Sequence, residues 1–359
     1  KLEISELDFD GIKGNLKNFL SQQDEFRDYD FEGSGMAVLL DMLAYNTHYL
    51  GFNANMLANE MFLDSASLRS SITSHAKTLG YEVTSARSPI ATVNVALTTN
   101  SATKTMPAGT AFSTTVDDVS YQFVTIADVT SNNNGGVVSF DSTKIYEGTY
   151  VTTKFLVDTS DVEQRFLLGN DRADTSTLTV QVQTSASDST TTTYTKATDI
   201  TQLSSTSTVY YLQEVDAGRF EVYFGDGIVS RSLSDGNIVT MQYVVTNKTL
   251  SNGASSFSAP SLIDGVSDIT ITTVASASGG AEPESLNSIK LQAPLDYASQ
   301  GRAVTADDYA VYARKLFPNT QAVSVFGGED GSFDPSLGVS STPEYGKVFI
   351  SIKSTTGLN

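Results

Sequence analysis

The 359-residue sequence contains no cysteine and no tryptophan, and its two histidines are His48 and His75. A chain without cysteine forms no disulfide and offers no thiolate ligand to a metal ion. The two histidines are far apart in the sequence, in regions where we expect helices, and each fits a packed or surface position. The sequence therefore predicts no metal site and no cofactor.

Basic residues are also few. The chain has 22 Lys and Arg against 41 Asp and Glu, which gives a net charge of -19. Nucleic acids and anionic lipid surfaces both require a positive protein surface, and no apolar run reaches the roughly 20 residues of a membrane-spanning helix. We expect neither nucleic acid nor membrane as a partner. The acidic excess either keeps the chain in solution or faces basic partner subunits, and the sequence leaves both open.

The motifs of common enzymes are missing as well. There is no G-x-S-x-G, no Walker A sequence and no G-x-G-x-x-G. A carboxylate cluster could in principle form a hydrolase pair, but a solvated helix end fits it better; it consists of Asp24, Glu25, Asp28, Asp30 and Glu32. The acidic segment 329–334 lacks the spacing and the final Glu of an EF-hand. We predict that the protein is not an enzyme.

Residues 7–80 have the apolar periodicity of helices. Apolar residues recur at steps of three and four up to Phe26, and Gly33-Ser34-Gly35 separates this run from a longer one over 36–57. Asp64 and Ser65 are expected to cap a third helix. The second helix is apolar on more than one stripe, which predicts a partner surface, although packing on the rest of the same chain is the alternative. The predicted interface residues are Ile12, Leu16, Phe19, Phe26, Leu39, Leu43 and Tyr49.

The next region is rich in Ser, Thr, Val, Asn and Gly and alternates in polarity, which predicts antiparallel strands. The clearest runs are 92–97, 121–124, 178–182, 209–212, 219–224 and 239–244. Segment 184–193 is either a hairpin tip or a mobile loop. Gly225, Asp226 and Gly227 predict a tight structural turn, because Gly allows positive φ and Asp can bond its own turn.

The last region mixes helix and strand. A helix is expected over 283–300, where Pro294 should kink or end it. Gly301, Arg302 and Thr305 are predicted to form a rigid joint, with Arg302 buried and Thr305 capping the following helix together with Asp308. Strands are expected over 322–326 and 347–352. Because this strand, loop and strand unit looks unfinished, we expect the polypeptide to continue beyond Asn359.

The predicted fold is therefore multidomain α+β. It consists of a helical segment at 1–88 for bundle or partner packing, an antiparallel β-rich domain at 89–278, and an α+β unit at 279–359.

Several motifs occur together in this order: DYDFEGSGM (28–36), LAYNTHY (43–49), NEMFLDSA (59–66), FGDG (224–227), the pair Glu284-Ser285, and GRAVTADDY (301–309). With them the chain resembles the baseplate wedge subunit of contractile-tailed bacteriophages of the T-even type, in the baseplate J-like superfamily. The C-terminal α+β unit corresponds to the baseplate J-like part of that resemblance.

The resemblance implies a structural protein of the virion tail baseplate that is assembled in the host cytoplasm. It implies a homodimer within each wedge, joined to a second elongated wedge protein, with the sheath-initiating subunit and other baseplate proteins as further partners. Six wedges would close a ring around the hub, which changes shape on tail contraction. The alternative is a β-rich glycan-binding or glycan-hydrolysing protein, which the absence of tryptophan makes less attractive.

Overall fold

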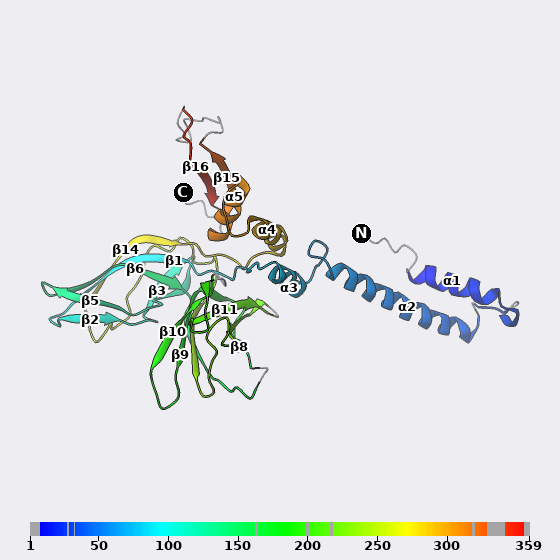
Figure 1. Cartoon of the computed structure of the whole chain (residues 1–359), viewed down its shortest axis with the longest axis horizontal. Helices are drawn as coiled ribbons and strands as arrows, with labels where there is room; N and C mark the ends of the chain where they lie inside the picture. Colours follow the sequence, from blue (N-terminus) through cyan, green and yellow to red (C-terminus); the bar gives the residue numbers. More distant parts are fainter. Residues whose placement is uncertain are drawn as a thin grey trace. The chain divides into compact units, whose positions relative to one another are not determined.

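The computed structural model describes residues 8–26, 29–31, 33–161, 164–198, 202–215, 218–317, 320–328 and 342–354. The chain divides into two compact units, Lys1–His75 and Ala76–Asn359. Helices come first, two β-sheets follow, and helices with a small sheet close the chain (Figure 1). The predicted α+β class is confirmed.

The first unit is helical. An antiparallel hairpin of α1 (Phe9–Ser21) and α2 (Gly35–Glu60) includes a short 3-10 turn, η1 (Asp24–Phe26), in its connection, and α3 (Arg69–Thr78) begins within the same unit. Among the described residues, no helix has the length and apolar content to cross a membrane.

A seven-stranded antiparallel sheet opens the second unit. Its strands are β1 (Ile90–Thr98), β2 (Thr103–Met106), β3 (Ala111–Val116), β4 (Val119–Val124), β5 (Val129–Asn134), β6 (Val137–Glu147) and β14 (Ile269–Ser278). Their order is β14-β1-β6-β4-β3, and β5 pairs with both β6 and β2. Alternate residues of β1 from Ala91 to Leu97 are buried, and they share a core with Phe112, Phe123 and Phe140.

The second sheet also has seven strands and a core of its own. The strands are β7 (Thr149–Leu156), β8 (Phe166–Leu167), β9 (Ala173–Gln183), β10 (Thr191–Lys196), β11 (Val209–Glu214), β12 (Phe220–Phe224) and β13 (Ile238–Val245). They lie in the order β7-β13-β9-β10-β11-β12-β8. Met241 and Tyr243 of β13 pack in this core with Val180 and Val222.

Two sequence predictions can be judged on this sheet. Strands β9 and β10 pair as an antiparallel hairpin, so the Ser- and Thr-rich segment between them is a hairpin tip. The predicted antiparallel, β-rich domain is confirmed, with one pair of strands in this sheet as an exception, because β10 pairs with β11 in parallel. Alternation of polarity shows which face a side chain takes, but it carries no information on strand direction.

The chain passes from the first sheet to the second at Gly148. Its φ is +128°, and a Cβ atom there would lie 2.2 Å from the carbonyl oxygen of Val245. Only glycine combines this conformation with so close a backbone approach. The crossing from β6 to β7 is therefore fixed sterically.

The C-terminal elements are α4 (Leu286–Ser299), α5 (Ala306–Leu316), β15 (Thr320–Gly327) and β16 (Val348–Ser354). Ser285 caps α4 by accepting a hydrogen bond from the Ser288 backbone N–H. The helix continues through Pro294 to Ser299, so the proline does not end it. Helix α5 packs against α4 and against the antiparallel β15–β16 pair.

Candidate assembly interface on the helical hairpin

The hairpin begins with a well-defined cap and is held by an ion pair. Asp8 Oδ1 accepts a hydrogen bond of 2.7 Å from the backbone N–H of Gly11, which satisfies one of the free donors at the start of α1. Lys13 Nζ lies 2.5 Å from Asp41 Oδ1, so the middle of α1 is level with the first half of α2. Of these two contacts, the ion pair is the one that joins the two helices.

The seam between the two helices is narrow. The buried residues are Ile12 on α1 with Leu40 and Ala44 on α2. Small residues recur along α2 every seven positions, at Ala37, Ala44, Gly51 and Ala58. A stripe of small side chains lets another helix approach closely. At a rise of about 1.5 Å per residue, the 13 residues of α1 reach only about half the length of the 26-residue α2.

Most large apolar side chains of the hairpin face away from this seam. Their exposed fractions range from 39% at Met56 to 69% at Val38 and Leu57. The exposed set, called here the apolar surface of the hairpin, consists of Phe19, Val38, Leu39, Met42, Leu43, Tyr45, Tyr49, Leu50, Phe52, Met56 and Leu57. Many exposed large apolar side chains on one helical hairpin mark a protein interaction site more often than an isolated exposed leucine does.

The predicted interface residues fall into three groups. Phe19, Leu39, Leu43 and Tyr49 are half or more exposed, with Phe19 at 62%. Leu16 and Phe26 are partly buried, and Phe26 packs edge-on against Tyr29 with the ring centroids 5.7 Å apart. Ile12 is buried in the seam. In the isolated chain its side chain therefore packs within the hairpin, and a contact of Ile12 with a partner stays a prediction.

Glu60, the last residue of α2, stabilises the connection from α2 to α3. Its Oε1 accepts hydrogen bonds from the Ser67 backbone N–H at 2.8 Å and from the Ser67 hydroxyl at 2.7 Å. These bonds, led by the Ser67 hydroxyl, lower the pKa of Glu60 to about 2. The predicted caps are wrong, because the Ser65 hydroxyl donates back to the carbonyl oxygen of Asn59 and α3 starts only at Arg69. A contact across seven residues has no recognisable sequence pattern, so sequence reasoning does not find Glu60.

Neither histidine belongs to a metal cluster among the described residues, where no group of three or more His, Asp or Glu side chains could hold an ion. His75 Nε2 lies 2.9 Å from the carbonyl oxygen of Glu60, and His48 lies half-buried on α2. Of the acidic cluster at the hairpin connection, Asp28 and Glu32 lie outside the described residues, as does the segment 329–334.

The turn after β12 is rigid. Asp226 Oδ1 accepts hydrogen bonds from the backbone N–H groups of Ile228 at 2.9 Å and Val229 at 3.2 Å, which lower the pKa of this carboxyl. A Cβ atom on Gly225 would lie 2.5 Å from the carbonyl oxygen of Ser230. Glycine is thus required at position 225 by the close approach of the backbone.

The segment 301–305 differs from the rigid joint that the sequence predicts. Arg302 is exposed, and its Nη2 donates a 2.8 Å hydrogen bond to the side-chain oxygen of Gln300. The prediction of a buried guanidinium on a carbonyl or carboxylate is wrong, because the left-handed conformations of Gln300 and Gly301 carry the chain along the surface. Thr305 caps α5, and Asp308 completes the capping box. Asp308 accepts from the Thr305 and Val304 backbone N–H groups, which lower its pKa.

Three family models match this chain. Residues 8–81 match the helical domain of the gp6-like baseplate wedge protein, residues 155–254 match the third domain of the bacteriophage baseplate wedge protein gp6, and residues 305–359 match C-terminal domain I of the baseplate structural protein gp6. The first match covers the hairpin that carries the apolar surface.

A full-length relative gives the same result. The chain is 31% identical over 348 residues to the baseplate wedge protein gp6 of Enterobacteria phage T4, a match that covers 89% of this chain and 51% of the relative. The chain therefore spans about half the length of that relative. On the agreement of three matched regions with this extended identity, the chain belongs to the gp6-like family of bacteriophage baseplate wedge proteins.

Proposed function

We propose that this chain is a structural component of the tail baseplate in a phage virion, and that it joins its wedge through the apolar surface of the α1–α2 hairpin. The single observation that carries the proposal is the amount of exposed apolar side chain on a hairpin whose own seam buries few residues. Burying a large apolar side chain contributes about 1.5–3 kcal/mol. An assembly that covers this surface would therefore gain stability from many side chains at once.

The chemistry of this surface favours helices as partners. Small residues at seven-residue spacing continue along α2 past the reach of α1, at Gly51 and Ala58. Large apolar residues flank them, with Leu50 exposed at 61% and Leu57 at 69%. This pattern accepts the ridge of a further helix. We infer that α2 takes part in a bundle formed with a second copy of this chain and with a second, elongated wedge protein.

Further partners follow from the proposed place in the wedge. The sheath-initiating subunit and neighbouring baseplate proteins would contact the same wedge, and the completed ring would change shape when the tail contracts. The role is mechanical, and no catalytic step is part of it. Support comes from the T4 relative, which is a baseplate wedge protein.

Electron cryo-microscopy of tail baseplates that contain this protein tests the proposal. The expected result is helical density against the exposed face of α2, with Leu43, Leu50 and Leu57 buried between chains. Baseplates in which this face of α2 borders solvent along its whole length would overturn it.

A further inference from the structure

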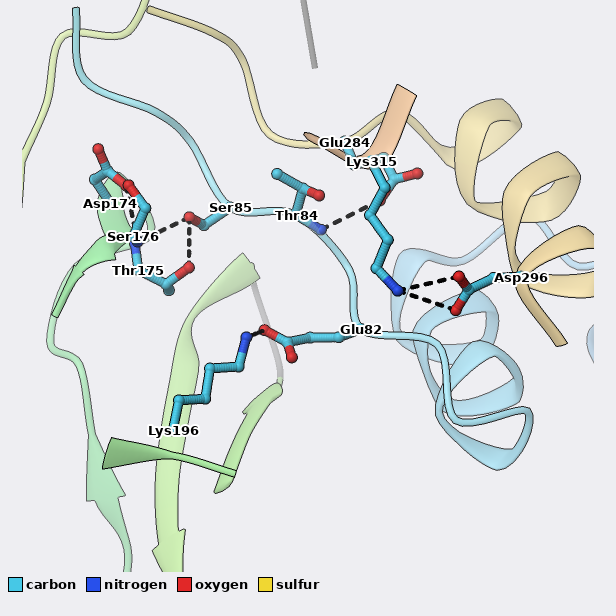
Figure 2. A network of polar contacts seen from close by, with 10 residues as sticks. All are labelled: Glu82, Thr84, Ser85, Asp174, Thr175, Ser176, Lys196, Glu284, Asp296 and Lys315. Carbon is cyan, nitrogen blue, oxygen red and sulfur yellow. Dashed lines mark hydrogen bonds and ion pairs between the residues drawn. The ribbon is translucent and has the colours of Figure 1, made fainter. Parts of the chain in front are cut away.

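The segment 81–88, called here the strap, connects α3 to β1 without forming helix or strand, apart from a single bridge at Arg87. It is nevertheless largely buried, since Tyr81, Val83, Ser85 and Ala86 are each less than 9% exposed. Its backbone and side chains are bonded mainly to polar groups of other elements. Figure 2 shows part of these contacts, among them those of Glu82, Thr84 and Ser85.

On one side the strap is fastened to the second sheet. The hydroxyl of Ser85 lies 2.9 Å from that of Thr175 and accepts a 3.0 Å hydrogen bond from the Thr175 backbone N–H. The Ser88 backbone N–H donates to Asp174 Oδ2 at 2.8 Å, and both groups are buried. Glu82 forms an ion pair with Lys196 of β10 (Figure 2). These contacts, from Glu82 to Ser88, join the strap to β9 and β10.

On the other side the strap is fastened to the chain leading into α4, and Glu284 is the centre of this attachment. The Tyr81 hydroxyl donates to Glu284 Oε1 at 2.8 Å, and the Thr84 backbone N–H donates to Glu284 Oε2 at 3.2 Å. The Glu284 backbone N–H in turn donates to the carbonyl oxygen of Thr84 at 3.0 Å. The Ser288 hydroxyl also donates to Glu284 Oε1, at 2.7 Å. One carboxylate therefore joins the strap to the first turn of α4.

Little else fastens the C-terminal elements to the two large sheets. We call α4, α5, β15 and β16 the C-terminal module. Among the described residues, these elements pack extensively only on one another and on no strand of either seven-stranded sheet. Additional links are the backbone bridge between Arg87 and Ala281 and two hydrogen bonds between Asn252 and Gly280. Lys315 of α5 also lies over the Tyr81 ring, and Lys248 forms an ion pair with Glu282. The glutamate of that ion pair is 60% exposed, and such surface pairs contribute little.

The hydrogen bonds to Glu284 can also be replaced by hydrogen bonds to water without disrupting a hydrophobic core. It borders a cavity of about 450 Å³ whose lining includes Tyr81, Thr84, Ser288 and Arg314. The cavity walls are rich in hydroxyl and charged groups, so water can replace a lost hydrogen bond there. Lys315 lies over the Tyr81 ring at 5.9 Å and is held by Asp296. Release at Glu284 would therefore leave the packing of α4 on α5 intact.

We propose that Glu284 is a latch: it fixes the C-terminal module to the strap, and its release lets that module turn as one body relative to the sheets. The strap stays on the second sheet in both states, because its bonds to Asp174 and Thr175 do not involve Glu284. This inference concerns the chain by itself and does not depend on the proposed assembly through the hairpin.

Distance measurement between two spin labels tests the latch directly. Because the chain has no cysteine, labels can be placed at Thr193→Cys on β10 and Leu291→Cys on α4, both exposed positions. The parent should give one narrow distance distribution. Glu284→Ala should at least double its width or add a second population. Asp307→Ala, the loss of an exposed carboxylate in α5, should leave it unchanged.

A milder variant keeps the test decisive if Glu284→Ala unfolds the chain. Tyr81→Phe keeps the ring and removes one hydrogen bond to Glu284, so it should broaden the distribution partially without changing the circular dichroism spectrum. A distribution in Tyr81→Phe and Glu284→Ala as narrow as in the parent overturns the latch. Equal broadening in Asp307→Ala overturns it as well, because the loss of an unrelated surface carboxylate would then have the same effect.

Discussion

Glu60, the last residue of α2, holds the start of α3 through a 2.8 Å hydrogen bond from the backbone N–H of Ser67. The same carboxylate accepts from the Ser67 hydroxyl, and its pKa falls from 4.5 to about 2. A carboxyl whose pKa is lowered by folding stabilises the folded state above its unfolded pKa and loses that contribution as the pH falls.

The first prediction follows from this shift. Thermal unfolding of the helical unit should occur at progressively lower temperature as the pH falls from about 4.5 towards 2, and Glu60→Gln should remove part of this dependence. Circular dichroism at 222 nm over that pH range is the measurement. Asp64→Asn is the matched control, because Asp64 does not cap α3. An identical pH profile for Glu60→Gln and the parent would contradict the assignment.

The second prediction separates assembly from folding. Leu43→Asp and Phe19→Asp place a charge on the apolar surface, where the side chains are 51% and 62% exposed in the free chain. Stability of the isolated chain should change by less than about 0.5 kcal/mol. Incorporation into purified baseplates should fall at least tenfold, since a buried unpaired charge is costly.

Asn46→Asp is the control for these variants, because it adds the same charge at an exposed polar position of α2. It should be incorporated at close to the parental level. Normal incorporation of Leu43→Asp would remove Leu43 from the interface.

The third prediction concerns the turn after β12. Gly225→Ala would force a Cβ atom to within 2.5 Å of the Ser230 carbonyl oxygen, and we expect a loss of about 1–3 kcal/mol. Gly14→Ala in α1 meets no atom within 4 Å and should be neutral or stabilising by up to about 1 kcal/mol. Urea unfolding followed by tyrosine fluorescence and by circular dichroism distinguishes the two. Equal stability of Gly225→Ala and the parent would show that the turn can shift.

The fourth prediction replaces the expectation of a buried Arg302. Arg302→Lys should change stability by less than about 0.5 kcal/mol, because the guanidinium is exposed and its hydrogen bond to Gln300 is a surface contact. Thr305→Ala removes the cap of α5 and should cost about 1 kcal/mol. Chemical denaturation of the two variants side by side provides the comparison. A larger loss in Arg302→Lys than in Thr305→Ala would reverse this assignment.

Much of the fold is accessible from the sequence. Polarity alternates along β1, β9 and β13, and apolar residues recur every three or four positions in α1 and α2. Both patterns can be read from the sequence because they follow from which side chains are buried. Strand β14 is not among the strands expected from the sequence, although Ile269 and Ile271 alternate with Thr and pack against the core. Ala277 is its one buried residue, and most of its other side chains are exposed. The parallel pairing of β10 with β11 is also not accessible, because it depends on the path of the chain between the two strands.

The residues with interaction roles are predictable in part. The excess apolar load of α2 indicates a partner surface from the amino acids alone. Which individual residues face a partner depends on how α1 lies on α2, and this places Ile12 in the seam. Glu60 and Glu284 act through contacts across seven and about 200 residues, to Ser67, Tyr81 and Thr84. No local pattern contains that information.

The accessibility of α2 in assembled baseplates tests the central claim most directly. Met42→Cys, at a position 62% exposed in the free chain, would be the only cysteine in this sequence, and Ser187→Cys on the β9–β10 hairpin serves as the reference. Reaction with a maleimide should be fast for both variants in the free chain. In intact baseplates the labelling rate at position 42, relative to position 187, should fall at least tenfold. An unchanged ratio would contradict assembly through the helical hairpin.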